Sequence, residues 1–283
     1  MNAMRSRLTA WQASFLAPAG LVWLCLFALP LASFLVFSFW SVRARIMRPD
    51  FTFRNYVATI TEYGDVLAWT LLTALAIALV TTLIAYLFAY AIRFRAGRYG
   101  DLLLFVTLIA LFGGYLVKIY AWKSILGRDG IINSLLMFLG IIDEPIGVLI
   151  YSQGAVVITL AYFLLPFAVL PIYGSMRSIP DDLIEAARDL GAGPIQAARD
   201  MVLPLCERGI NVAFLFSFLI AAGDYVTPRF VGGGASMMGH FIETQFSFGF
   251  NWPMGSAMSF TLLAASLAVV SLFRFGLRRS LAR

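Results

Sequence analysis

Residues 178–205 read SIPDDLIEAARDLGAGPIQAARDMVLPL, a polar stretch between two long apolar runs. Pro180 suits the start of a helix, and three acidic side chains that follow favour the positive end of the helix dipole: Asp181, Asp182 and Glu185. Four apolar residues then recur at helical spacing and form one stripe: Leu183, Ala186, Ala187 and Leu190. Gly191 and Gly193 end this helix, and Pro194 begins a second one that carries Ile195, Ala198 and Val202 on one face. The stretch therefore predicts two short helices separated at Gly191.

The apolar stripe has two interpretations that the pattern leaves open. A helix of about ten residues is marginal alone and needs something to pack against. The stripe packs either on the ends of the chain's own membrane helices or on a partner protein. In the second case Ala186 and Ala187 would permit a close backbone approach.

The composition places these short helices in an integral membrane protein. Of the 283 residues, 61% are hydrophobic and 13% are charged, whereas a soluble domain carries about 25% charged residues. The net charge of +6 would raise nucleic acid as a partner of a soluble protein. Here the arginines lie mainly between apolar runs, so we expect cytosolic loops in contact with membrane lipid and no nucleic acid. With two cysteines and one histidine, the sequence also predicts no disulfide framework and no metal site.

Six runs are apolar enough to cross a bilayer, which takes about 20 residues. We expect an all-α membrane protein with six transmembrane helices, at 15–40, 67–92, 102–120, 148–173, 210–230 and 255–275. We place both termini in the cytosol, with 1–14 as the N-terminal segment and 174–209 as a cytosolic loop, because 13 of the 21 basic residues then lie inside. Four arginines in the first external loop oppose this bias: Arg43, Arg45, Arg48 and Arg54.

One acidic residue lies within the fifth predicted span. Asp224, followed by Tyr225, stands beyond the middle of the span, where an ionisable side chain is a candidate functional residue because exposing it to lipid is costly. A carboxylate beside a tyrosine would suit a cationic substrate on a translocation path. Alternatively, Asp224 caps backbone groups freed by Gly223 and Pro228, or pairs with a cation, Arg229 or Lys118. The sequence leaves these alternatives open.

The chain lacks the phosphate-binding loop G-x-x-x-x-G-K-[ST]. Its only lysine followed by serine or threonine is Lys123, and Val117 and Trp122 occupy the two glycine positions of that motif. We therefore expect no ATP hydrolysis and no cofactor on this chain.

Two groups of residues resemble a known family. Glu185-Ala186-Ala187, Gly191 and Met201-Val202-Leu203-Pro204 are similar in type and spacing to the EAA motif of ABC-importer permeases, and depart from it only at Met201, where isoleucine is usual. A second stretch, which includes Gly223-Asp224-Tyr225, Thr227-Pro228 and Asn251-Trp252-Pro253, resembles the spermidine/putrescine permease family.

The resemblance implies a type I ABC importer permease fold with its core at 67–273, located in the cell inner membrane. It implies three kinds of protein partner: a second permease subunit, two cytosolic subunits that bind ATP and Mg, and an extracytoplasmic substrate-binding protein. The implied substrate is a polyamine. It also implies that the 174–209 loop couples to the ATPase through Leu183, Glu185, Ala186, Ala187, Leu190, Gly191, Leu203 and Pro204. Another small solute, such as an opine or an amino-acid-like compound, stays possible as substrate. A secondary transporter is disfavoured because the spans hold few charges besides Asp224.

Overall fold

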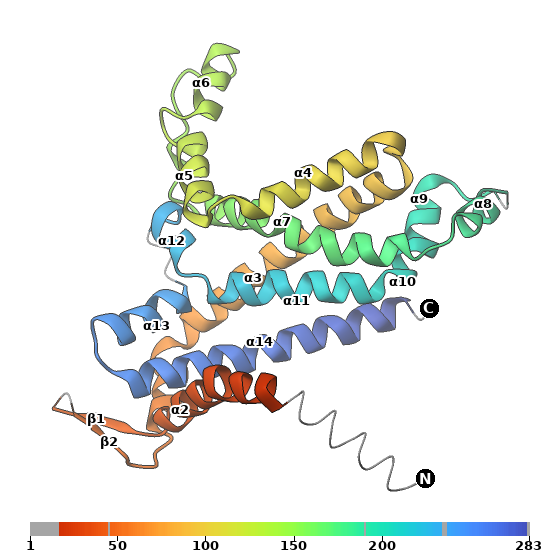
Figure 1. Cartoon of the computed structure of the whole chain (residues 1–283). Coiled ribbons are helices and arrows are strands. Elements are labelled where there is room, and N and C mark those ends of the chain that lie inside the picture. The colour runs from red at the N-terminus through yellow and green to blue at the C-terminus, as the bar shows by residue number, and fades with distance from the viewer. Residues whose placement is uncertain (1–16, 45, 190, 234–236, 282–283) are drawn as a thin grey trace, which may run out of the picture. The chain divides into compact units, whose positions relative to one another are not determined.

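The computed structural model describes residues 17–44, 46–189, 191–233 and 237–281. Apart from one short hairpin, the regular structure of these residues is helical. The chain divides into two compact units, Met1–Tyr63 with Ile242–Thr261, and Gly64–Phe241 with Leu262–Arg283 (Figure 1).

The first unit contains the first apolar helix, Ala17–Phe37, which includes a π-helical segment, η1 (Leu24–Ala28), followed by α2 (Leu29–Phe37). An antiparallel hairpin follows, in which β1 (Ser41–Arg43) pairs with β2 (Ile46–Arg48). The unit also holds the first turns of α3 (Arg54–Phe94) and α14 (Trp252–Leu281), and the end of α13 (Met238–Ser247). Phe34 of α2 stacks on Trp252 with ring centroids 6.0 Å apart and meets Phe246 edge-on, so aromatic contacts hold α2 in place.

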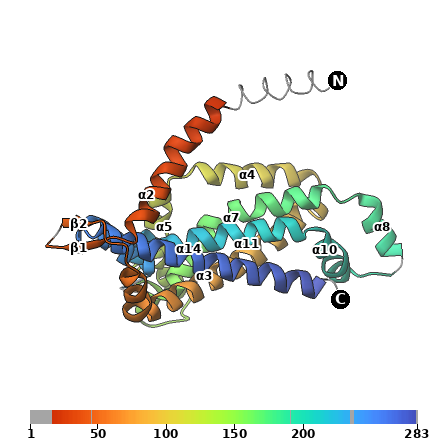
Figure 2. The same cartoon turned by 90° about the horizontal axis from the view of Figure 1, so that it is seen from below.

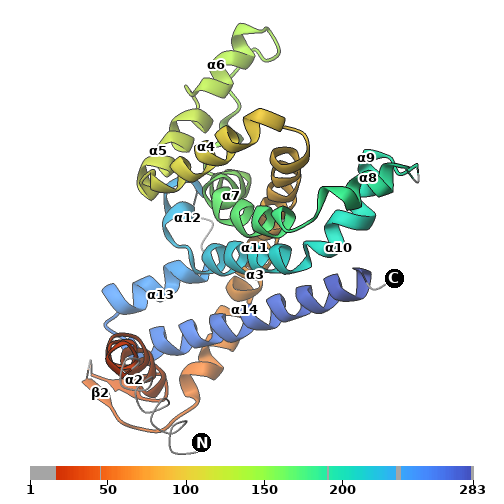
Figure 3. The ribbon, with the colours of Figure 1, turned by 45° about the vertical axis from the view of Figure 1, so that its right-hand side comes forward.

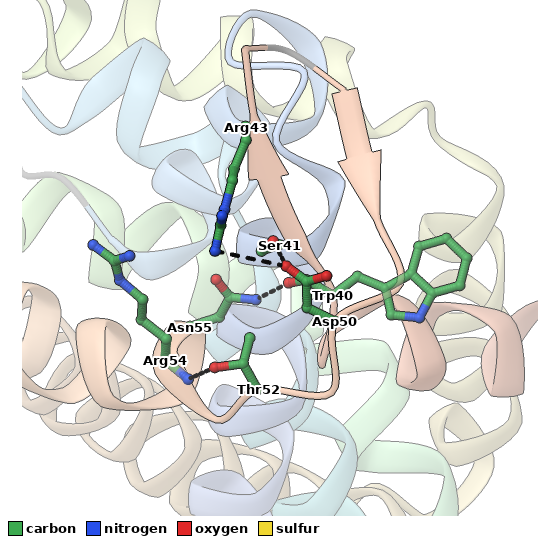
Figure 4. A network of polar contacts seen from close by, with 7 residues as sticks. All are labelled: Trp40, Ser41, Arg43, Asp50, Thr52, Arg54 and Asn55. Atoms are coloured by element: carbon green, nitrogen blue, oxygen red, sulfur yellow. Dashed lines mark hydrogen bonds and ion pairs between the residues drawn. The ribbon is translucent and has the colours of Figure 1, made fainter.

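A polar network secures the arginine-rich hairpin (Figure 4). The Asn55 side-chain amide, in the first turn of α3, donates to the carbonyl oxygens of Ser38 and Trp40 at 2.9 and 2.8 Å. The Ser41 hydroxyl donates to the carboxylate of Asp50, which lies 4.0 Å from the guanidinium of Arg43. Because Arg43 and Asp50 are both well exposed, their ion pair adds little stability. The Asn55 amide bonds fix the chain directly before β1 and so anchor the base of the hairpin.

The second unit is built around α7 (Gln153–Arg177) and α11 (Glu207–Gly223), which lie side by side (Figures 1 and 2). Gly209 permits this approach, because a Cβ at that position would collide with the Pro171 carbonyl oxygen and the Ser175 hydroxyl. Fully buried alanines and larger apolar residues of the two helices and of α3 form the core there, including Ala89, Ala168, Ile172, Ala213 and Phe214.

The remaining elements of the second unit are shorter. After α3 come η2 (Gly97–Tyr99), α4 (Gly100–Phe112), α5 (Tyr115–Leu126), α6 (Ile131–Phe138) and η3 (Gly147–Leu149). The predicted cytosolic loop contains α8 (Asp181–Asp189), α9 (Pro194–Gln196), the π-helical η4 (Ala197–Val202) and α10 (Leu203–Leu205). After α11, α12 (Val226–Val231) leads to the start of α13.

Four helices of the described residues are long and apolar enough to cross a membrane: Ala17–Phe37, Arg54–Phe94, Gln153–Arg177 and Trp252–Leu281. Two bent pairs raise the number to six if each pair forms one span, Gly97–Phe112 with Tyr115–Phe138 and Ala197–Leu205 with Glu207–Gly223. The orientation of these helices in the bilayer stays a prediction.

Two of the predicted spans are interrupted in the structure, and only the second interruption lies where the sequence had indicated freed backbone groups, at Gly223 and Pro228. The 102–120 run breaks at Gly113 and Gly114, whose backbones are extended, and the flanking helices bend by 102° (Figure 3). The 210–230 run breaks after Gly223, because Asp224 adopts an extended backbone and α12 begins anew at Val226. Hydropathy carries no signal for a break within an apolar run, so the second break was indicated by Gly223 and Pro228 and the first was not predicted.

Candidate functional site

Asp224 lies in the break between α11 and α12 and is only 8% exposed. Its Oδ1 accepts hydrogen bonds from the Tyr115 hydroxyl at 2.7 Å and from the Val226 N–H at 3.1 Å. Its Oδ2 accepts from the Thr227 N–H at 3.2 Å. The carboxylate therefore caps the first turn of α12, where backbone N–H groups have no helical partner.

The same bonds join this break to the one between α4 and α5. Tyr115 is the first residue of α5, directly after the two extended glycines. Its hydroxyl lies 2.7 Å from the Thr227 hydroxyl as well as from Asp224. Since the tyrosine proton goes to the carboxylate, the Thr227 hydroxyl donates to Tyr115. Two interrupted helices that are distant in sequence thus share one hydrogen-bonded cluster.

The side chain of Lys118 donates its hydrogen bond to a backbone carbonyl and not to Asp224. It is buried, and its Nζ donates to the carbonyl oxygen of Ala110 at 2.5 Å, a group that the break at Gly113 leaves outside the helical pattern. The same Nζ lies 5.1 Å from the centre of the Phe163 ring. These contacts do not support the alternative in which Lys118 pairs with Asp224. Of the alternatives open for Asp224, these contacts support the cap, and its neighbour Tyr225 is 39% exposed.

The α8 helix turns one face inward and another outward. Ile184 is buried in a core cluster with Ile179, Val202 and Cys206, and Ala187 is also buried. Leu183 is 41% exposed, and Glu185 and Ala186 are exposed. The expectation that Ala187 shares an outward surface with Leu183 is corrected, because Ala187 belongs to the inward face. Leu190, the fourth member of the predicted stripe, lies outside the described residues.

The bend after α8 depends on Gly191. Its φ is +86°, a left-handed conformation that favours glycine, and nothing lies within 4 Å of where a Cβ would stand. The Ala192 N–H donates back to the Ala187 carbonyl at 2.9 Å, which closes the end of α8.

The segment after the bend is wound more loosely than an α-helix. In η4 the fully buried side chains are Ala197 and Val202, five residues apart, as π-helical winding requires. Ile195, expected on the face of Val202, is 82% exposed. Leu203 packs against the core cluster, and Pro204 occupies the first turn of α10.

Two side chains of α3 anchor this loop, and neither was predictable from the sequence. The Tyr86 hydroxyl donates to the Ala198 carbonyl at 2.6 Å, across 112 residues of sequence. The Arg93 guanidinium donates to the Asp181 carboxylate at 2.7 Å and to the Ile179 carbonyl at 3.3 Å. Bonds of this separation follow from the packing of the helices, which no local pattern encodes.

The described residues contain no group of three or more His, Cys, Asp and Glu side chains placed to hold a metal ion. The two features of the candidate site are a buried polar junction between two broken helices, and a loop that is anchored to α3 on one side and exposed on the other.

Comparison with known proteins gives a consistent result. Residues 102–283 match the family described as "Binding-protein-dependent transport system inner membrane component". The spermidine/putrescine transport system permease protein PotB of Escherichia coli (strain K12) is 35% identical over 77% of this chain and 80% of its own length. PotB of Haemophilus influenzae is 36% identical over 77% of this chain and 78% of its own length.

A solved structure shares the fold. The chain is similar over its full length to a chain of a bacterial ABC transporter involved in the import of the acidic polysaccharide alginate, with a TM-score of 0.73, 15% identity and full coverage of both chains. A second crystal structure shows a bacterial alginate ABC transporter in complex with an alginate pentasaccharide-bound periplasmic protein, with a TM-score of 0.71, 16% identity and 99% coverage of both chains.

Proposed function

The chain belongs to the family of binding-protein-dependent transport system inner membrane components, and we propose that it passes spermidine, putrescine or a related cationic amine across the membrane. It is a permease subunit of an ABC importer. The substrate rests on its relatives: PotB proteins named for spermidine and putrescine are 35–36% identical to it over 77% of its length.

The remaining subunits follow from the same membership. In the proposed importer, a second permease subunit completes the path, two cytosolic subunits bind ATP with Mg and hydrolyse it, and an extracytoplasmic protein delivers the amine. The absence of a phosphate-binding loop from this sequence supports hydrolysis by a partner. The chain spans the inner membrane with both termini in the cytosol, an orientation supported by the distribution of its arginines.

The two-faced α8 carries the proposed coupling. Its outward residues, Leu183, Glu185 and Ala186, would dock on the ATP-binding subunit. Its inward residues Ile184 and Ala187 and the Arg93–Asp181 ion pair join it to the helices behind. A push on the outward face therefore reaches α3 and the α7–α11 core through packed side chains, which transmit displacement because interiors are close-packed. In this way closure of the ATPases would move the permease helices.

Asp224 acts in this proposal as a positioning residue. Its three acceptor bonds hold the ends of α5 and α12 together, so that the two breaks move as one body. Tyr225, which is partly exposed beside it, is the candidate for contact with the passing amine through a cation–π interaction.

Reconstitution tests the substrate. The complete importer, with its binding protein, is placed in proteoliposomes loaded with ATP on the side of the ATP-binding subunits. We expect ATP-dependent uptake of radiolabelled spermidine that unlabelled putrescine competes with and that an opine of similar size does not. Uptake of the opine without uptake of either polyamine would overturn the substrate and leave the permease role in place.

A further inference from the structure

A groove lies between α11 and the C-terminal part of α14, both within the second unit. Its volume is about 570 Å³. The stacked rings of Phe214 and Phe273, with centroids 3.6 Å apart, bridge the two helices. The Arg278 guanidinium adds a second bridge by donating to the Glu207 carboxylate at 2.8 Å. The walls of the groove are therefore held at a set separation.

The lining of the groove is basic. Arg208, Arg274 and Arg278 face one acidic side chain, Glu207, so that three positive charges against one negative leave an excess of two. Arginine keeps its charge at any physiological pH. An occupant of complementary chemistry must carry negative charge.

The lining of the groove also contains a buried hydrogen-bond acceptor that has no donor in the part of the chain that the structure describes. The Asn211 amide turns its Nδ2 toward Glu207, at 3.4 Å, and its buried Oδ1 has no hydrogen-bond partner among the described residues. A buried carbonyl oxygen without a partner is unusual and costly. Because this oxygen is shielded from solvent, a ligand hydroxyl or ammonium group in the groove can bind it only if the Asn211 side chain turns toward the groove.

The groove is apolar away from the arginines. Going from Glu207 along α11, Val212 and Leu215 follow, and Val270 faces them from α14 on the side away from Arg278. Polar groups at the helix ends and apolar residues toward the middle of two membrane-spanning helices reproduce the profile of half a bilayer.

We propose that this groove binds one anionic phospholipid of the phosphatidylglycerol type. Its phosphate lies between Arg208 and Arg274, and an acyl chain follows Val212, Leu215 and Val270. The Asn211 side chain turns toward the groove on binding, so that a hydroxyl of the glycerol headgroup donates to its Oδ1. With the proposed orientation, this lipid belongs to the cytosolic leaflet. The site is independent of which amine the importer carries.

Native mass spectrometry of the purified importer, titrated with phosphatidylglycerol and with phosphatidylcholine of the same acyl chains, tests the site. We expect the first added lipid to be phosphatidylglycerol. Arg274→Gln should weaken this first binding about fivefold, the worth of one arginine at a lipid surface. The matched variant Arg279→Gln, which removes a neighbouring exposed arginine outside the lining, should leave it unchanged.

The headgroup contact has its own test. Phosphatidic acid has the phosphate but no headgroup hydroxyl, so Asn211→Ala should weaken phosphatidylglycerol and leave phosphatidic acid unaffected, whereas Arg274→Gln should weaken both. Equal binding of phosphatidylglycerol and phosphatidylcholine, or an equal loss with Arg279→Gln, would overturn the proposal.

A photocrosslinker distinguishes lipid from protein as the occupant. Ser271 lines the groove and is exposed, so Ser271→Cys can carry a benzophenone maleimide in the assembled importer. An adduct with the mass of phosphatidylglycerol supports the site. An adduct with a partner subunit would show that protein fills the groove and would overturn the lipid proposal.

Discussion

The chain interrupts its helices in two different ways, at Asp224 in the predicted membrane region and at Gly191 in the predicted cytosolic loop. At Asp224 the freed backbone groups are satisfied by a buried carboxylate, and the Tyr115 and Thr227 hydroxyls close the cluster. At Gly191 the chain turns by a left-handed residue in open space, and the surface before the turn stays exposed.

The difference reflects the solvent at each place. Hydrocarbon offers no hydrogen bonds, so a break inside a membrane bundle has to be closed by the chain's own polar groups. Water satisfies the backbone at a cytosolic break, so the residues around it can be kept for a partner. Substitutions at the Asp224 break should therefore impair assembly of the importer. Substitutions at the Gly191 break should leave assembly intact and impair coupling to ATP hydrolysis.

Replacement of Asp224 should have the largest effect. Asp224→Leu leaves two backbone N–H groups without an acceptor and leaves the Tyr115 hydroxyl only Thr227 as a partner, which should cost about 2–6 kcal/mol in folding free energy and abolish assembly. Asp224→Asn keeps the Oδ1 contacts and loses the one to Thr227, at about 1–2 kcal/mol. Thermal stability of the purified complex and spermidine uptake measure both. If Asp224→Asn abolished uptake while assembly and stability stayed as in the wild type, its charge would act on the substrate and the cap would not be its main role.

The Gly191 bend should give the next largest effect. Glu185→Lys with Gly191→Val reverses the exposed charge and strains the turn by about 1–2 kcal/mol. We expect a normally inserted complex whose uptake falls roughly tenfold through lost coupling. ATP hydrolysis and uptake, measured together in proteoliposomes, give the coupling ratio.

Gly140 offers a matched control for the strained turn. It also has a positive φ, +67°, with nothing within 4 Å of the position that a Cβ would take, and it lies in a predicted external segment. Gly140→Val carries a similar strain and should leave the coupling ratio unchanged. Wild-type coupling in the Glu185→Lys, Gly191→Val variant would show that this loop does not couple the permease to the ATPase.

Loss of the Arg93 anchor should have a smaller effect. Arg93→Gln removes the ion pair with Asp181 and the bond to the Ile179 carbonyl, together about 1 kcal/mol, because the Asp181 side chain is largely exposed. Uptake should fall about twofold to fivefold with assembly intact. Arg95→Gln changes an exposed arginine two residues along and should have no effect. Equal results for the two variants would mean that α8 needs no anchor on α3.

The smallest expected effect concerns the reactivity of the Cys206 thiol, which is buried behind the loop. Burial raises the pKa of Cys206 to about 11, so at pH 8 only about one thiol in a thousand is the reactive thiolate. Maleimide should label Cys206 very slowly over pH 7–9, and labelling should rise only in stronger alkali. Leu205→Cys in a Cys206→Ala background places a thiol on the neighbouring, 54% exposed position and should react readily. Fast labelling of Cys206 at pH 7 would mean that the inward face of the loop opens in the resting state.

The sequence predicted the fold class and the family because both rest on local signals. Apolar run length predicted a helical membrane protein, and the spacing from Glu185 to Pro204 indicated an importer permease. Which face of α8 is buried was not predictable. Ala186 and Ala187 are the same residue type, and only the position of the helices behind α8 decides which of them is covered. The Tyr115–Asp224 and Tyr86–Ala198 bonds were also out of reach, since each joins residues more than a hundred positions apart. A carboxylate next to Gly223 and Pro228 did suggest the cap, and the contacts favour that alternative.

The two anchors on α3, Tyr86 and Arg93, are synthesised before the loop that they bind. Arg93 is made 88 residues before Asp181, an interval of roughly 4–18 s at about 5–20 residues per second. Tyr86 likewise precedes Ala198 by 112 residues. When the loop leaves the ribosome, both of its attachment points already exist on the same polypeptide. The inward half of α8 can therefore fold on the nascent subunit, and only the outward half has to wait for the proposed ATP-binding subunits.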